Sequence, residues 1–252
     1  MNLSVAIITY NEEQIIKRTL EAVNNIADEI IIVDSYSTDK TEEICKGFPK
    51  VKFLKRKFDG YGTQKNYTIE RCSGKWILFV DADEVLDELL QKSVYEMVSG
   101  GDDSVKVYNS ELHTFFLGKI LKYGGWGKTF RERLFMKGYA KYSEDIVHEK
   151  FITKANNKGR LNGTITHYTY RNINHHIDKT NVYTSMMAQK MYEKGKKASF
   201  LTMYIKPKFQ FFKTYVLRLG FLDGLVGYYI AKTAAFYTLL KYSKLYELQN
   251  KE

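Results

Sequence analysis

Four strand-like apolar runs divide the first hundred residues of this 252-residue chain, and helix-like segments separate them. The runs cover residues 3–9, 29–34, 51–56 and 75–81. Runs such as LSVAIIT and EIIIVD are continuously apolar instead of alternating, which is typical of strands covered on both faces. Strands of this kind that alternate with helices form parallel sheets. The sequence therefore predicts a doubly wound α/β half, in which ligands bind beyond the carboxyl ends of the strands.

Short polar turns precede the predicted helices, so polar side chains gather at the carboxyl ends of the strands. Asn11 is the expected N-cap of the first helix, with Glu12 and Glu13 in its first turn. The three later helices are expected over residues 40–47, 61–72 and 86–99.

Beyond residue 100 the pattern changes to shorter strands and a glycine-rich loop over residues 122–135, which we interpret as a mixed continuation of the same sheet. Residues 173–197 have a helical pattern, and the chain then becomes rich in aromatic, aliphatic and basic side chains. We therefore expect three segments, of which the first two form one α/β domain and the third a helical extension. They are residues 1–100, 101–172 and 173–252.

The net charge of +10 is unevenly distributed. Residues 1–100 contain 13 Lys and Arg against 17 Asp and Glu, whereas residues 101–252 contain 26 against 12. We therefore expect the basic part to meet a polyanion, either nucleic acid or an anionic membrane surface. Residues 190–218 concentrate this character, with eight Lys and Arg and one acidic residue among aromatic side chains. A nucleic-acid surface, an amphipathic membrane element and a docked helical subdomain all fit this pattern.

The two cysteines and the lengths of the apolar stretches bear on the cellular compartment and on whether the chain spans a membrane. Cys45 and Cys72 have neither CxxC spacing nor a nearby histidine, which favours a reduced, cytoplasmic setting without a zinc or disulfide framework. The N-terminal apolar stretch has no basic segment before it, unlike a secretory signal. The apolar tract over residues 225–240 is interrupted by Lys232 and is shorter than the roughly 20 residues that a spanning helix needs. No transmembrane segment is expected.

The turn after the first apolar run reads TYNEE and contains no glycine. Dinucleotide-binding and P-loop proteins hold phosphates on a glycine-rich backbone, with the motifs GxGxxG or GxxxxGK[ST]. Neither motif is present. If a nucleotide binds here, its diphosphate must be held by something other than a glycine-rich loop, and a divalent metal is the obvious candidate.

The fourth run ends in the acidic motif DADE, residues 81–84. Side chains alternate along a strand, so Asp81 and Asp83 would share a face if the strand continues through Ala82. Two carboxylates so placed repel each other, and a bound Mg²⁺ or Mn²⁺ would relieve that repulsion. The alternative is that Asp83 and Glu84 only cap the following helix. We place Glu84 in the following turn.

Two further motifs supply polar groups to the same edge of the sheet. Asp34 ends the second run, where its carboxylate can accept hydrogen bonds from a base imide or a ribose, whereas Asp39 more simply opens the next helix. The GTQKN segment either brings Lys65 towards a diphosphate or leaves it as a surface lysine on a helix.

In order and spacing, TYNEE, VDSYSTDKT, the QKN segment and DADE resemble the nucleotide-sugar half of inverting family 2 glycosyltransferases with the GT-A fold. The resemblance implies a nucleotide-sugar donor, UDP-linked, and a bound Mg²⁺ or Mn²⁺. It implies that Asp34 contacts uracil or ribose, Asp81 the ribose or metal, and Asp83 the metal. The residues implied to line the donor pocket are Thr9, Tyr10 and Glu12.

Later segments resemble a narrower group within this family. RLFMKG, VHE, THYTY and RLGFLDGLVGYY are similar to segments of small bacterial transferases of lipopolysaccharide inner-core assembly, of the β-1,4-glucosyltransferase type. This likeness implies transfer of glucose from UDP-glucose onto a lipid-linked glycan at the inner face of the cytoplasmic membrane. It assigns donor binding to residues 1–100, and acceptor binding with catalysis to residues 101–172. Residues 173–252 are then a membrane-associating extension.

An inverting transfer needs one general base and a group that neutralises the departing diphosphate. The candidate bases are Asp145 and Glu149, with Glu144 behind them, and we favour Glu149 because it adjoins His148 in the segment that resembles the family motif. The same acids also fit structural ion pairs with neighbouring basic residues. His148 or His167 is a candidate third metal ligand, although a histidine at a strand end commonly binds a backbone carbonyl.

Trp126 lies among glycines, so its ring either stacks on an acceptor sugar or fills a core. Other acceptors open to a transferase of this fold are a polyprenyl phosphate, a capsule repeat or a peptide. A basic nucleic-acid-binding α/β module is the alternative from another class, but it leaves the clustered Asp34, Asp81 and Asp83 unexplained. We expect no nucleic-acid partner, and we assign the anionic membrane surface to the basic aromatic extension.

Overall fold

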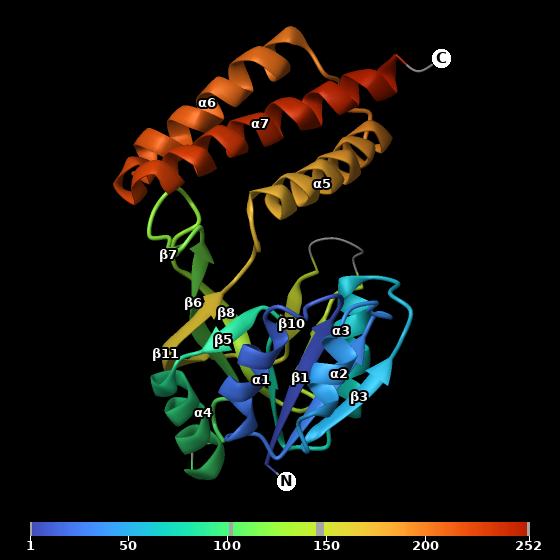
Figure 1. Ribbon diagram of the computed structural model, residues 1–252, viewed down its shortest axis with the longest axis vertical. Helices are drawn as coiled ribbons and strands as arrows, with labels where there is room; N and C mark the ends of the chain where they lie inside the picture. The colour runs from blue at the N-terminus through green and yellow to red at the C-terminus, as the bar shows by residue number, and fades with distance from the viewer. Residues whose placement is uncertain (1, 101–102, 145–148, 251–252) are drawn as a thin grey trace. The chain divides into compact units, whose positions relative to one another are not determined.

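The structure is a computed structural model, and it describes residues 2–100, 103–144 and 149–250. Its elements, labelled in Figure 1, divide into two compact units. Unit 1 contains Met1–Leu112 and Thr129–His167, and unit 2 contains His113–Lys128 and Tyr168–Glu252. The expected boundaries at residues 100 and 172 stay a prediction.

A mixed sheet forms the centre of unit 1 (Figure 1). Its parallel part runs in the order β3 (Val51–Lys55), β2 (Glu29–Asp34), β1 (Leu3–Thr9) and β4 (Trp76–Phe79). An antiparallel part follows in the order β8 (Thr129–Met136), β6 (Val107–Phe116), β11 (Gly159–His167) and β5 (Glu84–Leu86). The predicted mixed α/β sheet is therefore confirmed.

Helices cover both faces of this sheet, as predicted. One buried apolar cluster contains side chains of α1 (Ile16–Asn24), α2 (Thr41–Lys46) and α4 (Glu88–Gly100), and the other contains side chains of α3 (Tyr61–Arg71). Along β1, Val5 and Ile7 pack in the first cluster and Ala6 in the second, because successive strand side chains point to opposite faces. Each fully buried isoleucine contributes about 2 kcal/mol of hydrophobic free energy. The need to cover both faces explains the continuous apolar runs.

The first helix begins later than its sequence predicts. Asn11 does not cap it, because α1 starts at Ile16 without a side-chain cap, and Glu12 and Glu13 precede the helix. Asn11 instead adopts a left-handed φ of 55°, and its side chain accepts a hydrogen bond from the Thr38 amide (2.8 Å). Asparagine tolerates this backbone region better than most residues. The polar turn after β1 is therefore tied to the turn after β2.

A small hairpin lies beside α3 and leads towards Glu149. It consists of β9 (Ala140–Tyr142) and β10 (Phe151–Thr153). The Asn66 side chain hydrogen-bonds both backbone groups of Tyr142, donating to its carbonyl (2.9 Å) and accepting from its amide (2.8 Å). Helix α3 therefore holds this hairpin in the way that a neighbouring strand would.

Unit 2 is mainly helical, which confirms the predicted helical extension. Its main helices are α5 (Ile173–Glu193), α6 (Lys206–Phe212) and α7 (Gly224–Gln249), and Figure 1 shows α7 between the other two. The strand β7 (Lys119–Ile120) pairs with the end of β6, and Asp223 accepts hydrogen bonds from the Lys122 and Tyr123 amides. In the part of the chain that the structure describes, no helix combines the length and hydropathy of a membrane span.

Candidate active site

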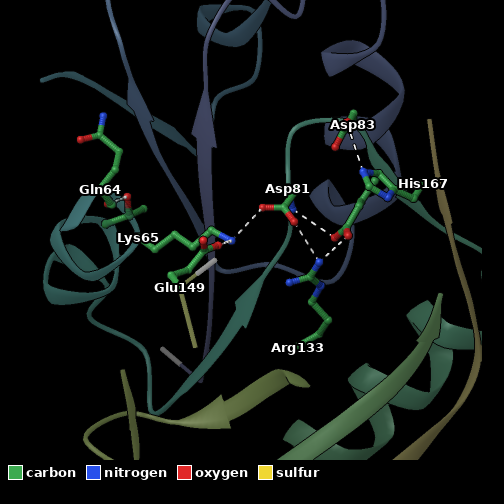
Figure 2. Close-up of polar contacts among 9 residues, drawn as sticks. Gln64, Lys65, Asp81, Asp83, Arg133, Glu149 and His167 are labelled. Carbon is green, nitrogen blue, oxygen red and sulfur yellow. Dashed lines mark hydrogen bonds and ion pairs between the residues drawn. The ribbon is translucent and has the colours of Figure 1, made fainter. Parts of the chain in front are cut away.

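The turn after β4 carries the acidic motif. β4 ends at Phe79, and the Glu84 amide donates to the Asp81 carbonyl (3.0 Å), which closes a turn. The condition that a strand continues through Ala82 is therefore not met, and Asp81 and Asp83 do not share a strand face. The chain returns as β5, in which Glu84 pairs with His167 of β11. Figure 2 shows that the two aspartates consequently meet different cations.

Asp81 lies between two buried cations (Figure 2). Its Oδ2 accepts a hydrogen bond from Arg133 Nη2 (2.9 Å), and its Oδ1 lies 3.5 Å from Lys65 Nζ. Burial alone would favour the neutral acid, but Lys65 and Arg133 hold the pKa of Asp81 well below its usual range. Two protein cations thus offset the charge of Asp81. Its contact with ribose or metal stays a prediction.

Arg133 and Glu84 also contact the site residues, although their sequence context did not indicate this. Glu84 does not belong to a polar turn: it begins β5, is fully buried, and contacts Arg133 through Oε1. Burial raises the pKa of Glu84 in spite of this contact. The available signal was Arg133 itself, because an arginine that directly precedes the apolar residues Leu134 and Phe135 needs acidic partners if it is buried with them.

Lys65 projects from α3 into the site and is only 6% exposed. Its Nζ donates to Glu149 Oε1 (2.8 Å) and lies over the rings of Phe79 and Tyr142. Burial disfavours the ammonium, but the Asp81 carboxylate outweighs this effect and raises the pKa of Lys65 above its usual range. The alternative of a surface lysine is therefore wrong. One ammonium joins Asp81 to the favoured candidate base.

His167, at the end of β11, meets Asp83. Its Nε2 lies 3.2 Å from Asp83 Oδ2. Burial opposes protonation of the imidazole, but the Asp83 carboxylate outweighs burial and raises the pKa of His167 to about 9. The pair is therefore an ion pair at neutral pH when no metal competes for it.

The Asp83–His167 pair also fits a divalent metal. Carboxylate and imidazole are both suitable ligands for Mn²⁺, and the metal would replace the proton on the imidazole. Within residues 2–100, 103–144 and 149–250, no group of three or more His, Cys, Asp and Glu is arranged to hold a metal. Diphosphate oxygens and water would therefore have to complete the metal's coordination shell.

The predicted donor-pocket residues lie at the ends of β1 and β2, where Thr9 is paired in register with Asp34. Thr9 Oγ1 is buried and has no hydrogen-bond partner among the described residues, which suits a ligand contact. Asp34 is fully buried and accepts hydrogen bonds from the Ser37 amide and hydroxyl, so it shapes the turn that follows. Tyr10 is 57% exposed, and Glu12 donates its amide to Thr41 Oγ1 (2.8 Å). Their contacts with a nucleotide stay predictions.

Three further predicted residues lie either outside the described part of the chain or in unit 2. Asp145 and His148 lie outside the described residues. Trp126 belongs to unit 2, where its ring packs against Phe116 and Tyr170 with centroids 6.0 and 5.4 Å away. This packing supports the interpretation that Trp126 fills a core, and its contact with an acceptor sugar stays a prediction.

Comparison with known proteins gives the family. Residues 4–161 match the profile described as glycosyl transferase family 2. The chain belongs to this family. A relative in Rhizobium meliloti, the lipopolysaccharide core biosynthesis glycosyltransferase LpsC, is 30% identical over 97% of this chain and 92% of its own length. An uncharacterized glycosyltransferase of Rickettsia bellii is 32% identical over 98% of this chain and 86% of its own length.

Among solved structures, glucosyl-3-phosphoglycerate synthase of Mycobacterium tuberculosis in complex with Mn²⁺, UDP and phosphoglyceric acid is 21% identical. The match covers 46% of this chain and 44% of the synthase, with a TM-score of 0.36. The family match and the mixed sheet together confirm that the chain is a family 2 glycosyltransferase with the predicted GT-A fold.

Proposed function

We propose that this family 2 enzyme transfers a hexose, glucose from UDP-glucose, onto a lipid-linked glycan such as the lipopolysaccharide inner core. Similarity to LpsC supports the acceptor class. The observation that carries the proposal is the arrangement around Asp81, with Lys65 and Glu149 on one side and Asp83 with His167 beyond it (Figure 2). In this proposal the candidate base and the candidate metal-binding pair therefore lie on opposite sides of Asp81.

The proposed reaction is a single displacement that inverts the anomeric carbon. The acceptor hydroxyl oxygen attacks that carbon while its bond to the diphosphate oxygen breaks, and UDP leaves with the bonding electrons. Glu149 accepts the hydroxyl proton, and the Lys65 contact at 2.8 Å orients the Glu149 carboxylate. A divalent cation, Mg²⁺ or Mn²⁺, held by Asp83 and His167, would neutralise the charge on the diphosphate.

The donor pocket in this proposal is lined by Thr9, Tyr10, Glu12 and Asp34, with Asp81 at the ribose. Asp145 is the second candidate base, His148 the second candidate metal ligand, and Trp126 the proposed acceptor contact. Because the acceptor is lipid-linked, we place the enzyme as a peripheral protein on the inner face of the cytoplasmic membrane, with no nucleic-acid partner.

The metal site is tested with the variant Asp83→Asn. The amide lacks the charge that binds a cation, so metal-dependent hydrolysis of UDP-glucose should be abolished while the fold stays intact. Release of UDP from a panel of UDP-sugars, with and without Mn²⁺, measures this, and circular dichroism checks the fold. Asp178→Asn, an exposed substitution on α5, is the matched control and should retain turnover.

Two results would contradict the proposal. Metal-dependent turnover by Asp83→Asn would remove Asp83 from the metal site. Tight, metal-independent binding of oligonucleotides by the wild type, without any response to nucleotide sugars, would reject the transferase itself.

A further inference from the structure

One side of the helical segment 201–217 carries a row of exposed apolar side chains. Each of them is 41–62% exposed. They are Leu201, Ile205, Phe209, Phe212 and Val216. Their spacing of three or four residues places them on one helical face. Pro207 and Thr214, which fall on the opposite face, are buried. We call this row the apolar stripe.

The packing of unit 2 explains why the stripe is exposed. π-helical turns at Leu201–Ile205 and Lys213–Leu217 extend α6 in both directions. Helix α6 packs on α7, and Figure 1 shows α7 lying between α6 and α5. The contact with α7 accounts for one buried side of α6. The stripe lies on the other side.

The turn that joins α6 to α7 enlarges this apolar surface. Its exposed side chains are 43–88% exposed, and Leu225 is the most exposed of them at 88%. They are Leu217, Leu219, Phe221, Leu222 and Leu225. Leu219 also adopts a left-handed φ of 55°, which is uncommon for a residue other than glycine, asparagine or aspartate. We call this group the apolar turn. Ten exposed apolar side chains within residues 201–225 are typical of an interaction site.

The charges around the stripe have one sign. Residues 194–222 contain seven Lys and Arg and no Asp or Glu. Lys208 lies 3.7 Å from the centroid of the Tyr204 ring, so its aliphatic stem runs along the apolar surface. Unit 2 as a whole contains 17 Lys and Arg against five Asp and Glu, whereas unit 1 contains 22 against 24. A partner that complements this surface must therefore be both apolar and anionic.

We propose that the apolar stripe and the apolar turn together enter the headgroup boundary of an anionic bilayer. Exposed aliphatic and aromatic side chains would lie among the acyl chains, and the flanking cations would contact lipid phosphates. A second copy of the chain would oppose cations with cations, and nucleic acid would leave the leucines of the turn without stacking partners. The inference rests on the proposed function only in naming the lipid-linked glycan as the reason for binding.

Flotation with vesicles tests the surface. The full chain should float with equimolar phosphatidylglycerol and phosphatidylcholine vesicles, and far less with phosphatidylcholine alone. Phe209→Glu and Leu225→Glu should each reduce partitioning by about tenfold or more, because each replaces an apolar side chain that would be buried in the bilayer with a charged one. Leu89→Glu on α4 is the matched control, since Leu89 is 57% exposed, and it should float like the wild type.

A second pair of substitutions separates charge from hydrophobicity. Lys197→Glu combined with Lys208→Glu changes only exposed side chains, and it should weaken flotation and flatten its dependence on salt. Circular dichroism establishes that each variant is folded. If Phe209→Glu or Leu225→Glu unfolds, the double lysine variant still tests whether this surface binds anionic vesicles.

Several outcomes would overturn the proposal. Among them are flotation of the Phe209 and Leu225 variants equal to that of the wild type, and equal binding to neutral and anionic vesicles. Conversion of a dimer to a monomer by these variants in sedimentation velocity would assign the face to a second copy. The rate of UDP-glucose hydrolysis in solution tests the proposed transferase function separately from the proposed membrane surface. Lost flotation with normal hydrolysis leaves the transferase standing, whereas normal flotation without hydrolysis rejects only the transferase.

Discussion

Lys65 joins the favoured base to the first acid of the DADE motif, because its ammonium contacts Glu149 at 2.8 Å and Asp81 at 3.5 Å. Its raised pKa keeps it charged, so it offsets part of the negative charge that both carboxylates bring to the site. Arg133 plays the same part towards Asp81 and Glu84. The site is therefore a network in which each acid has a protein cation.

Glu149→Gln tests the base. The amide cannot accept the proton, so kcat for UDP-glucose hydrolysis should fall by about 10²- to 10⁴-fold while KM for the donor changes little. Steady-state kinetics with Mn²⁺ measure both constants. Glu96→Gln, an exposed acid on α4, should keep wild-type kinetics. Full activity of Glu149→Gln would transfer the role to another group, with Asp145 as the next candidate.

The Asp83–His167 pair gives metal binding a pH dependence. The pKa of His167 is raised from 6.5 to about 9, so the pair stabilises the fold fully below pH 6.5, and this stabilisation is lost as pH rises through about 9. A metal needs the neutral imidazole, so Mn²⁺ affinity in the presence of UDP should rise with pH up to about 9.

Titration calorimetry over this pH range measures the Mn²⁺ affinity. His167→Gln should bind more weakly and lose most of the pH dependence, whereas the control His113→Gln on β6 should keep it. A wild-type affinity that does not change with pH would show that His167 is not a ligand.

At the scale of elements, α3 contacts the hairpin segment that ends at Ser143. Gly62, Lys65 and Asn66 lie on one side of this helix, and each contacts the hairpin or its extension. A Cβ added to Gly62 would lie 1.8 Å from the Ser143 carbonyl oxygen, so only glycine permits this approach. The position of Glu149 therefore depends on the packing of a helix against a backbone.

Gly62→Ala should displace this segment and misplace the base. A misplacement of about 1 Å costs roughly 10²-fold in rate, so kcat should fall by about that factor with little change in donor KM. The matched control is Gly100→Ala on α4, where an added Cβ would meet no atom within 4 Å. It should keep full activity. Equal kcat in the two variants would show that α3 does not position the base.

Local patterns predicted most of unit 1. The apolar runs identified β1, β2 and β4, and polar turns identified the helices between them. A strand that is buried on both faces needs consecutive apolar residues, so a local pattern is enough to predict it. The end of β4 could not be predicted, since no turn residue separates ILFV from DADE. The turn there depends on the pairing of Glu84 with His167, which lies far along the chain.

The same limit applies to the site. The motifs selected Asp81, Asp83, Lys65 and Glu149 as candidates, and the structure brings these residues together, but the motifs did not show which cation each acid meets. The role of Arg133 comes from the pairing of β8 with β4, a long-range contact that no local pattern records. The local pattern at Asn11 is ambiguous, because asparagine is favoured both at helix N-caps and in left-handed turns.

At the scale of the whole molecule, the two units have different chemistry. Unit 1 contains the described candidate site, and its charges nearly balance, whereas unit 2 is strongly basic and exposes the apolar stripe and the apolar turn. A transferase that takes a soluble donor and a lipid-linked acceptor needs surfaces of both kinds. The proposed function assigns the donor to unit 1, and the proposed membrane surface assigns contact with the bilayer to unit 2.

Inversion at the anomeric carbon is decided by the configuration of glucose released from UDP-glucose in the presence of Mn²⁺. Proton NMR in the first minutes, before mutarotation, distinguishes the two anomers. Because UDP-glucose is α-linked, a single displacement by water, with Glu149 as base, releases β-glucose first. Release of α-glucose first would contradict the single-displacement mechanism, and no release under any metal condition would contradict the assignment of UDP-glucose as donor.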